Sequence, residues 1–192
     1  AAGVSSVGNT TLTVPPEVTP GTYYVIAIAD AGKVVIEALE TNNGLARATE
    51  VGGDLVVSAL TVPAKAAVGS DISVTETTRN DGAGGVSEST TRFYLSVNTT
   101  FGAGDTLLAG SHAVPALAPG ASSTSTTSVT IPTTVVPGTY YLIARADADN
   151  MVSEVTDSNN NLARSTQLGG DLILATLIVP AKGVAGSDVT VT

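Results

Sequence analysis

The segment between residues 147 and 157 carries the richest set of metal-ligand side chains in the chain. Its sequence is DADNMVSEVTD, and the candidate ligands in it are Asp147, Asp149, Asn150, Glu154 and Asp157. Calcium binds six to eight oxygens from carboxylates, amides and carbonyls on flexible loops, so these residue types suit it. The spacing is not that of an EF-hand, because the glycine and the final glutamate are out of place. Calcium is the one cofactor that the sequence suggests.

Turn capping is the second interpretation of this segment, and the one we favour. The same stretch occurs 117 residues earlier, with Gly32 in place of Asp149 and Lys33 in place of Asn150. A lysine among the acids can replace a cation electrostatically, so either calcium binds only some copies or the loop needs no metal. Asp and Asn side chains commonly cap backbone groups in tight turns.

The sequence predicts no enzyme. His112 is the only histidine, so a Ser-His-Asp arrangement would have to use it. It lies in a predicted strand without a nucleophile-elbow sequence, and we interpret it as a surface or core-edge residue. Carboxylates of the glycosidase kind are present, but the chain has no tryptophan and few tyrosines to line a sugar cleft. The absence of cysteine excludes thiolate nucleophiles and cysteine-bound zinc.

Composition and charge exclude further partners. The net charge is −9, and the eight lysines and arginines are scattered, whereas nucleic-acid binding needs a basic patch. No apolar run approaches the roughly 18 residues that span a bilayer, so we expect no direct membrane insertion. An acidic chain rich in Thr, Ser and Gly is typical of bacterial surface proteins, which indicates an extracellular or cell-surface location.

An internal repeat dominates the sequence. Residues 21–30 (GTYYVIAIAD) match residues 138–147 (GTYYLIARAD), and VPAK occurs at 62–65 and again at 179–182. Each pair is separated by 117 residues. At this offset residues 1–75 align with 118–192 without a gap, and 40 of the 75 positions are identical. The sequence therefore predicts tandem modules with a 117-residue repeat.

The repeat also predicts the domain boundaries. Residues 53–169 form one complete module, residues 1–52 are the C-terminal part of a preceding module, and residues 170–192 are the N-terminal strands of the following one. The joints between modules contain two glycines and an aspartate, at Gly52, Gly53 and Asp54 and again at Gly169, Gly170 and Asp171. Linkers this short allow little independent motion, so we expect restrained joints and an extended rod.

The complete module contains seven strand-like segments separated by turn residues. They are residues 54–63, 71–80, 87–97, 106–114, 121–131, 139–146 and 161–167. Seven short strands with frequent turns predict an antiparallel, immunoglobulin-like β-sandwich, and therefore an all-β fold.

Alternation along the strands predicts which side chains share a face. One set is Ile72, Val74, Glu76 and Thr78, a second is Phe93, Leu95 and Val97, and the third, Tyr140, Leu142 and Ala144, lies on the strongest strand. Tyr140 follows Pro-Gly, where such a sandwich places a tyrosine corner. Residues 154–159 are a candidate for one helical turn.

The order of motifs in this module resembles the CARDB family, the cell-adhesion-related domain of bacteria. The matching motifs are DLVVSALTVP, the NDG turn, FYLSVNTTFGAGDTLLAG, ALAPGAS, PGTYYLIARAD and DNMVSEVTDSNNN, and they extend over residues 53–169 and the flanking parts. The resemblance implies an immunoglobulin-like or fibronectin III-like sandwich that serves as a spacer or adhesive module. It implies no catalysis and no particular ligand.

We therefore expect a structural repeat module of a secreted bacterial surface fibre or adhesin. Its partners would be neighbouring modules of the same chain and, through self-association, other chains of a fibre. A passive stalk and a filament subunit are two forms of this function. The alternative from another class is a carbohydrate-binding accessory module of a secreted enzyme. Such modules expose a planar row of aromatic rings, which five tyrosines and two phenylalanines do not suggest.

Overall fold

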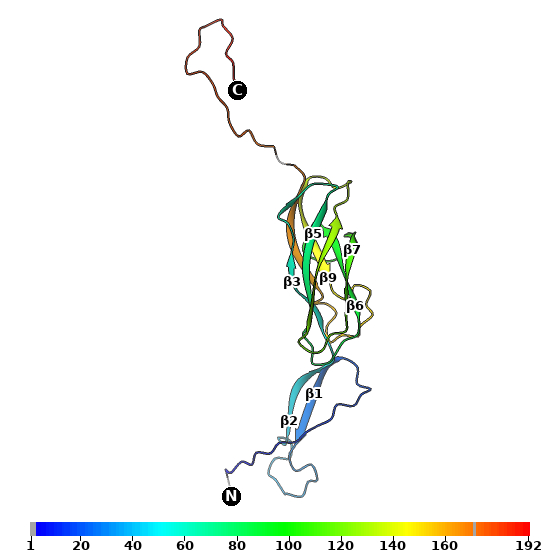
Figure 1. The fold of residues 1–192 in the computed structure, drawn as a ribbon. Helices are drawn as coiled ribbons and strands as arrows, with labels where there is room; N and C mark the ends of the chain where they lie inside the picture. Colours follow the sequence, from blue (N-terminus) through cyan, green and yellow to red (C-terminus); the bar gives the residue numbers. More distant parts are fainter. Residues whose placement is uncertain (1–2, 171) are drawn as a thin grey trace.

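The computed structural model describes residues 3–170 and 172–192. Figure 1 shows three parts in line: a two-stranded hairpin, a sandwich, and an extended C-terminal segment. In the part of the chain that the structure describes, all the regular elements are strands, and no helix could cross a membrane.

The sandwich consists of a five-stranded and a three-stranded sheet. The first has the order β4-β10-β9-β6-β7, and the second has the order β3-β5-β8. All pairs are antiparallel except β4 with β10. The strands are β3 (Leu55–Thr61), β4 (Lys65–Ala66), β5 (Asp71–Asn80), β6 (Ser89–Ser96), β7 (Thr106–Val114), β8 (Ser122–Thr130), β9 (Gly138–Arg145) and β10 (Asn161–Leu168). The prediction of an all-β antiparallel sandwich is confirmed.

All seven predicted strands are present, with three local differences. Strand β4 was missed because two residues are too few to show an alternation. Val97 is 74% exposed and does not share the buried face of Phe93 and Leu95, because β6 ends at Ser96. Residues 154–159 form turns and no helix. The Glu154 side chain accepts a hydrogen bond from the backbone of β3, which holds the segment against that strand.

The core lies between the two sheets and is built from aliphatic side chains around one aromatic ring. Leu55, Val74, Phe93, Leu142 and Ala144 are all fully buried. On β5 the buried positions alternate as the sequence predicts. Inward-facing residues of antiparallel strands alternate with outward ones, so each strand contributes every second side chain to this core.

The tyrosine corner is confirmed. The Tyr140 hydroxyl donates to the carbonyl oxygen of Val136 at 3.1 Å. Such a bond links the start of a strand to the chain just before it. Tyr23, 117 residues earlier, donates in the same way to the carbonyl oxygen of Thr19 at 2.9 Å.

The N-terminal hairpin has the geometry of β9 and β10. It consists of β1 (Gly21–Ile28) and β2 (Gly44–Val51), and every boundary lies 117 residues before the corresponding boundary of β9 or β10. The pairing register is also the same, from Gly21 opposite Val51 to Gly138 opposite Leu168.

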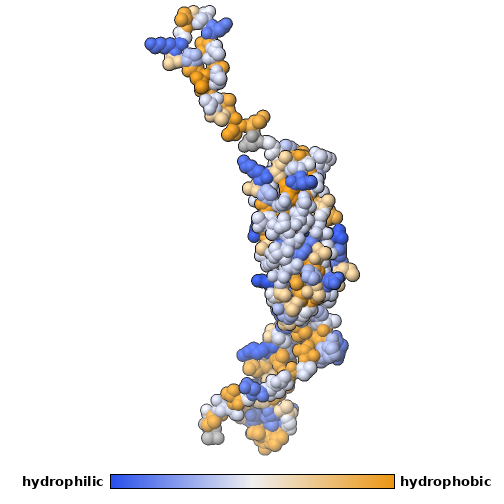
Figure 2. Space-filling model, viewed as in Figure 1, coloured by the Kyte–Doolittle hydropathy of each residue, from blue (hydrophilic) through white to orange (hydrophobic). Residues whose placement is uncertain are grey.

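The hairpin differs from β9 and β10 in what covers it. Val25 and Ile26 are 45% and 63% exposed, whereas the equivalent Leu142 and Ile143 are fully buried. Figure 2 shows apolar side chains on the surface of the hairpin and of the C-terminal segment, whereas the sandwich surface is mostly pale. One face of the hairpin therefore carries the apolar residues of a protein core. In the sandwich other strands cover the equivalent face, whereas in the hairpin it is exposed.

Residues 172–192 form no strand in the structure. The corresponding residues 55–75 form β3, β4 and the start of β5. Within the sandwich β3 pairs with β5, β4 pairs with β10, and β5 also pairs with β8. The segment therefore has the sequence of strands whose partners lie later in the repeat.

Candidate functional site

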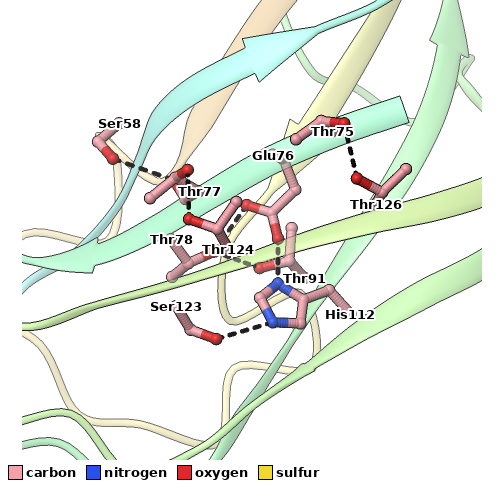
Figure 3. Close-up of polar contacts among 10 residues, drawn as sticks. All are labelled: Ser58, Thr75, Glu76, Thr77, Thr78, Thr91, His112, Ser123, Thr124 and Thr126. Atoms are coloured by element: carbon pink, nitrogen blue, oxygen red, sulfur yellow. Dashed lines mark hydrogen bonds and ion pairs between the residues drawn. The ribbon is translucent and has the colours of Figure 1, made fainter. Parts of the chain in front are cut away.

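A buried polar relay joins the two sheets near their edges. Glu76 lies on β5, His112 on β7 and Ser123 on β8, and Figure 3 shows their side chains pointing toward one another. His112 Nδ1 pairs with Glu76 Oε1, and His112 Nε2 lies 3.0 Å from Ser123 Oγ. Glu76 is fully buried and His112 is 6% exposed. The imidazole thus connects an edge strand of one sheet to two strands of the other.

Two threonines complete the relay. Thr78 Oγ1 donates to the second carboxylate oxygen of Glu76 at 3.0 Å, and it lies 2.7 Å from Thr91 Oγ1 on β6. Burial raises the pKa of Glu76, while the hydrogen bond and the charge of His112 act in the opposite direction. On the outer face of β5, Thr75 and Thr126 pair at 2.8 Å (Figure 3).

The contacts Ser123–His112–Glu76 have the connectivity of a serine nucleophile, its base and an orienting acid. Acyl transfer also needs a substrate cavity and donors aimed at the oxyanion. Neither Ser123 nor His112 lines the four surface hollows that lie around Gly169, Pro180, Ser89 and Tyr24. The geometry supports a polar bridge between sheets, with His112 at the core edge as its sequence position predicts.

The first predicted calcium ligand, Asp147, caps the loop that follows β9. Its Oδ1 accepts from the Met151 N–H at 3.0 Å, and its Oδ2 accepts from the Val152 N–H at 2.9 Å. Asp147 and Asn150 both have left-handed backbones, with φ of 39° and 53°. These bonds confirm the capping interpretation, since both carboxylate oxygens of this 1% exposed residue serve the turn.

Glu154 ties the same loop to the start of the module. It accepts from the Leu55 N–H at 2.5 Å and from Asn160 Nδ2 at 2.6 Å, and it is 8% exposed. Burial raises the pKa of Glu154 to about 7, and the charges of Asp147 and Asp157 contribute in the same direction. The Glu154 carboxyl group therefore holds β3, the first strand of the sandwich, in place, although its burial disfavours the charged form.

The other three predicted ligands point to different surroundings. Asp149 forms an ion pair with Arg92 at 3.0 Å, and Asn150 and Asp157 are exposed. Within the described residues, no group of three or more His, Cys, Asp or Glu side chains is arranged to hold a metal ion. Calcium binding through these five residues stays a prediction.

The hairpin repeats this loop. Asp30 accepts from the Val34 and Val35 N–H groups, both at 2.9 Å, and Asn43 Nδ2 donates to Glu37 at 2.6 Å. These are the contacts of Asp147 and Glu154 shifted by 117 residues. The cap therefore forms with Lys33 in the position of Asn150.

The predicted joint at Gly52, Gly53 and Asp54 forms hydrogen bonds with the sandwich. The carbonyl oxygen of Gly52 accepts from the Gly84 N–H at 2.7 Å, and that of Gly53 accepts from the Val155 N–H at 2.9 Å. At the second joint, Gly169 donates to the carbonyl oxygen of Ala66 at 3.0 Å. Gly170 is exposed, and Asp171 lies outside the described residues.

Asn80 holds the first joint together through its side chain. From the sequence, only a turn was predicted at this residue. Its fully buried side chain donates to the carbonyl oxygens of Gly84 and Leu117 at 2.8 and 3.1 Å. Its Oδ1 accepts from the Asp54 and Gly82 N–H groups at 3.1 and 3.0 Å. One side-chain amide thus holds the glycine-rich turn against the joint.

Comparison with solved structures gives low-identity matches to similar domains. A CARDB domain from Pyrococcus furiosus, described as in complex with di-metal ions, is 22% identical, with a TM-score of 0.48 over 62% of this chain and 96% of that one. A domain assigned to a cell surface protein from Methanosarcina acetivorans is 19% identical, with a TM-score of 0.45 over 62% and 93%. A β-glucosidase from Listeria innocua is 17% identical, with a TM-score of 0.41 over 66% of this chain and 17% of the enzyme.

None of the curated proteins matches this chain. The family model of CARDB matches residues 52–164, from the first joint into β10, which is more than half of the chain. The motifs in that range are those whose order the sequence analysis assigned to the same family. The chain therefore belongs to the CARDB family.

Proposed function

We propose that this chain is a section of a tandem array of CARDB modules in a secreted bacterial surface protein, where the modules act as stiff spacers or filament units. The observation that carries the proposal is the hydrogen-bonded joint. The carbonyl groups of Gly52 and Gly53 both accept from the complete module, through Gly84 and Val155. A two-glycine connection that is bonded in this way transmits orientation instead of swivelling freely.

The direction of the chain through the sandwich supports a rod. Strand β3 begins at Leu55 beside the hairpin, and β10 ends at Leu168 next to the C-terminal segment, at the opposite end of the sandwich (Figure 1). Units that are entered at one end and left at the other add their lengths when they repeat. Stacked repeats whose interfaces are mainly between neighbours form extended, quasi-one-dimensional arrays.

The hairpin supports the same proposal through its exposed face. Its register and its loop caps are those of β9, β10 and their connection. In the sandwich the corresponding face packs on core residues such as Leu55 and Phe93. The partners of the hairpin would therefore be the earlier strands of its own module.

Electron microscopy of the native, full-length material tests the proposal, with and without a calcium chelator. Fibres with a regular axial repeat support a filament unit, and separate thin rods with a distinct end support a stalk. Compact particles without an extended part would contradict both forms. Rods that slacken in chelator would in addition support calcium binding by the loop at residues 147–157.

A further inference from the structure

Two equivalent glycines, one at each joint, have opposite surroundings. Gly53 is buried, and a Cβ atom added to it would lie 2.1 Å from Val86 Cγ1 and 3.3 Å from the carbonyl oxygen of Gly84. Gly170, its equivalent 117 residues later, is exposed, and a Cβ atom there would meet nothing within 4 Å. The same position is therefore covered at the first joint and open at the second.

The cover at the first joint is the glycine-rich turn that follows β5. A Cβ atom at Gly82 would lie 2.5 Å from the carbonyl oxygen of Gly52, and one at Gly84 would lie 2.9 Å from the Gly52 carbonyl carbon. Real Cβ atoms do not approach this closely, so the turn can rest on the joint only with glycine at both positions. The Gly84 N–H then bonds to Gly52 at 2.7 Å.

A proline packs against the first glycine of each joint. A Cβ atom at Gly52 would lie 2.5 Å from Pro20 Cβ, and one at Gly169 would lie 2.6 Å from Pro137 Cβ. The two glycines have nearly equal backbones, with φ of 114° and 108°. A proline against a left-handed glycine is thus common to both joints, whereas among the described residues the covering turn lies at the first joint.

A surface hollow of about 490 Å³ lies at the second joint. Among the residues that line it are Lys65, Pro137, Thr139, Gly169 and Gly170. The hollow is adjacent to the backbone that corresponds to the one covered at the first joint. The Gly169 N–H donates to the carbonyl oxygen of Ala66, and the Gly169 carbonyl is the equivalent of the Gly52 carbonyl that accepts from Gly84.

We propose that this hollow is a socket for the glycine-rich turn of the following module, the equivalent of Asn80–Gly85. The inference rests on the tandem array proposed above, and it names the surface and the segment through which consecutive modules contact. The Gly169 carbonyl accepts from the turn, and the equivalent of Val86 packs on Gly170. Orientation between modules is then fixed by contact as well as by chain length.

One substitution, made in two chains, tests the socket. Gly170→Ala is made in the 192-residue chain and in the same chain extended after Thr192 by a copy of residues 76–169, which completes the following module because Thr192 corresponds to Thr75. In the shorter chain the new methyl group has open space, and we expect unchanged thermal unfolding. In the longer chain the new methyl group meets the copy of Val86 and displaces the turn. We therefore expect small-angle X-ray scattering to show a broader distribution of the end-to-end length of the molecule.

Amide exchange in the longer chain gives a second readout. We expect the copy of the Gly84 N–H to exchange at least about tenfold more slowly than an exposed amide, and Gly170→Ala to remove that protection. Gly104→Ala, in the sandwich of residues 53–169, is the matched control, because a Cβ atom there also meets nothing within 4 Å. The socket is refuted if Gly170→Ala behaves like this control while both modules remain folded by NMR. Extended rods in native material together with that result would refute the socket alone, whereas the absence of rods would refute the array.

Discussion

The carboxyl group of Glu76 and the imidazole of His112 form a buried polar pair that joins the two sheets of the sandwich. Glu76 is fully buried, and His112 is 6% exposed. The sequence contained half of this relationship, because Glu76 shares a face with Ile72 and Val74. An acid among inward-facing apolar residues requires a partner, and the only histidine was available to provide it.

Removing one partner of this pair is expected to destabilise the module strongly. His112→Ala leaves the Glu76 carboxyl group buried without its partner, and removing one member of a buried pair costs about 3–5 kcal/mol. Urea unfolding would measure the change in the free energy of unfolding. The double variant Glu76→Met with His112→Leu removes both polar groups and should cost less than the single change. A double variant as unstable as His112→Ala would show that the pair contributes through packing rather than through its polar contact.

Stability is expected to fall as the pH rises from about 5 to 8, in part because of Glu154. Its pKa is raised to about 7 in the folded protein from an ordinary value of 4.5. Between these values the folded state binds more protons than the unfolded state, so stability decreases with pH. The contribution of Glu154 is on the order of 2 kcal/mol.

Glu154→Gln tests this assignment by urea unfolding at pH 5 and pH 8. The amide oxygen can still accept from the Leu55 N–H, so we expect a flatter pH dependence with the fold retained. Glu88→Gln is the control, since Glu88 is exposed and its charge is not among those that act on Glu154. An unchanged pH dependence in Glu154→Gln would contradict the role of Glu154.

The capping role of Asp147 predicts a contrast between two substitutions in one turn. Asp147→Ala removes the acceptors of the Met151 and Val152 N–H groups and should cost about 2–3 kcal/mol. Asn150→Gly should be neutral or stabilising, because φ is 53° there and glycine adopts that conformation without a steric cost. Thermal unfolding of the two variants checks both values. Equal losses would show that the turn depends on its surroundings and not on the cap.

The strands could be predicted because their patterns are local. Alternation on β5 gave the buried face from Ile72 to Thr78, and Pro-Gly before Tyr140 gave the tyrosine corner. The error at Val97 arose where the strand ended and the alternation continued for one more apolar residue.

The contacts of the candidate sites could not be predicted in the same way, because they join residues distant in the sequence. Glu154 accepts from Leu55, 99 residues away, and His112 meets Glu76 across the sandwich. The internal repeat indicated that Gly52 and Gly169 are equivalent, but not that a turn from residue 82 to 84 covers Gly52. The role of Asn80 in that turn depends on four hydrogen bonds, which the sequence motif NDG does not reveal.

Calcium affinity is the last property that the loop geometry predicts. Both oxygens of Asp147 already accept backbone hydrogen bonds, and Glu154 accepts from Leu55 and Asn160, so we expect calcium at 1 mM to leave the thermal unfolding midpoint unchanged relative to chelator. A ligand that binds only the folded state must raise that midpoint, by an amount that grows with its concentration over Kd. Calorimetric scans with calcium, magnesium and chelator make the comparison, with Asp149→Asn as the variant that removes an exposed carboxylate paired only with Arg92. A calcium-specific rise that this variant abolishes would show that the loop rearranges around the ion, and the capped geometry would then be its metal-free form.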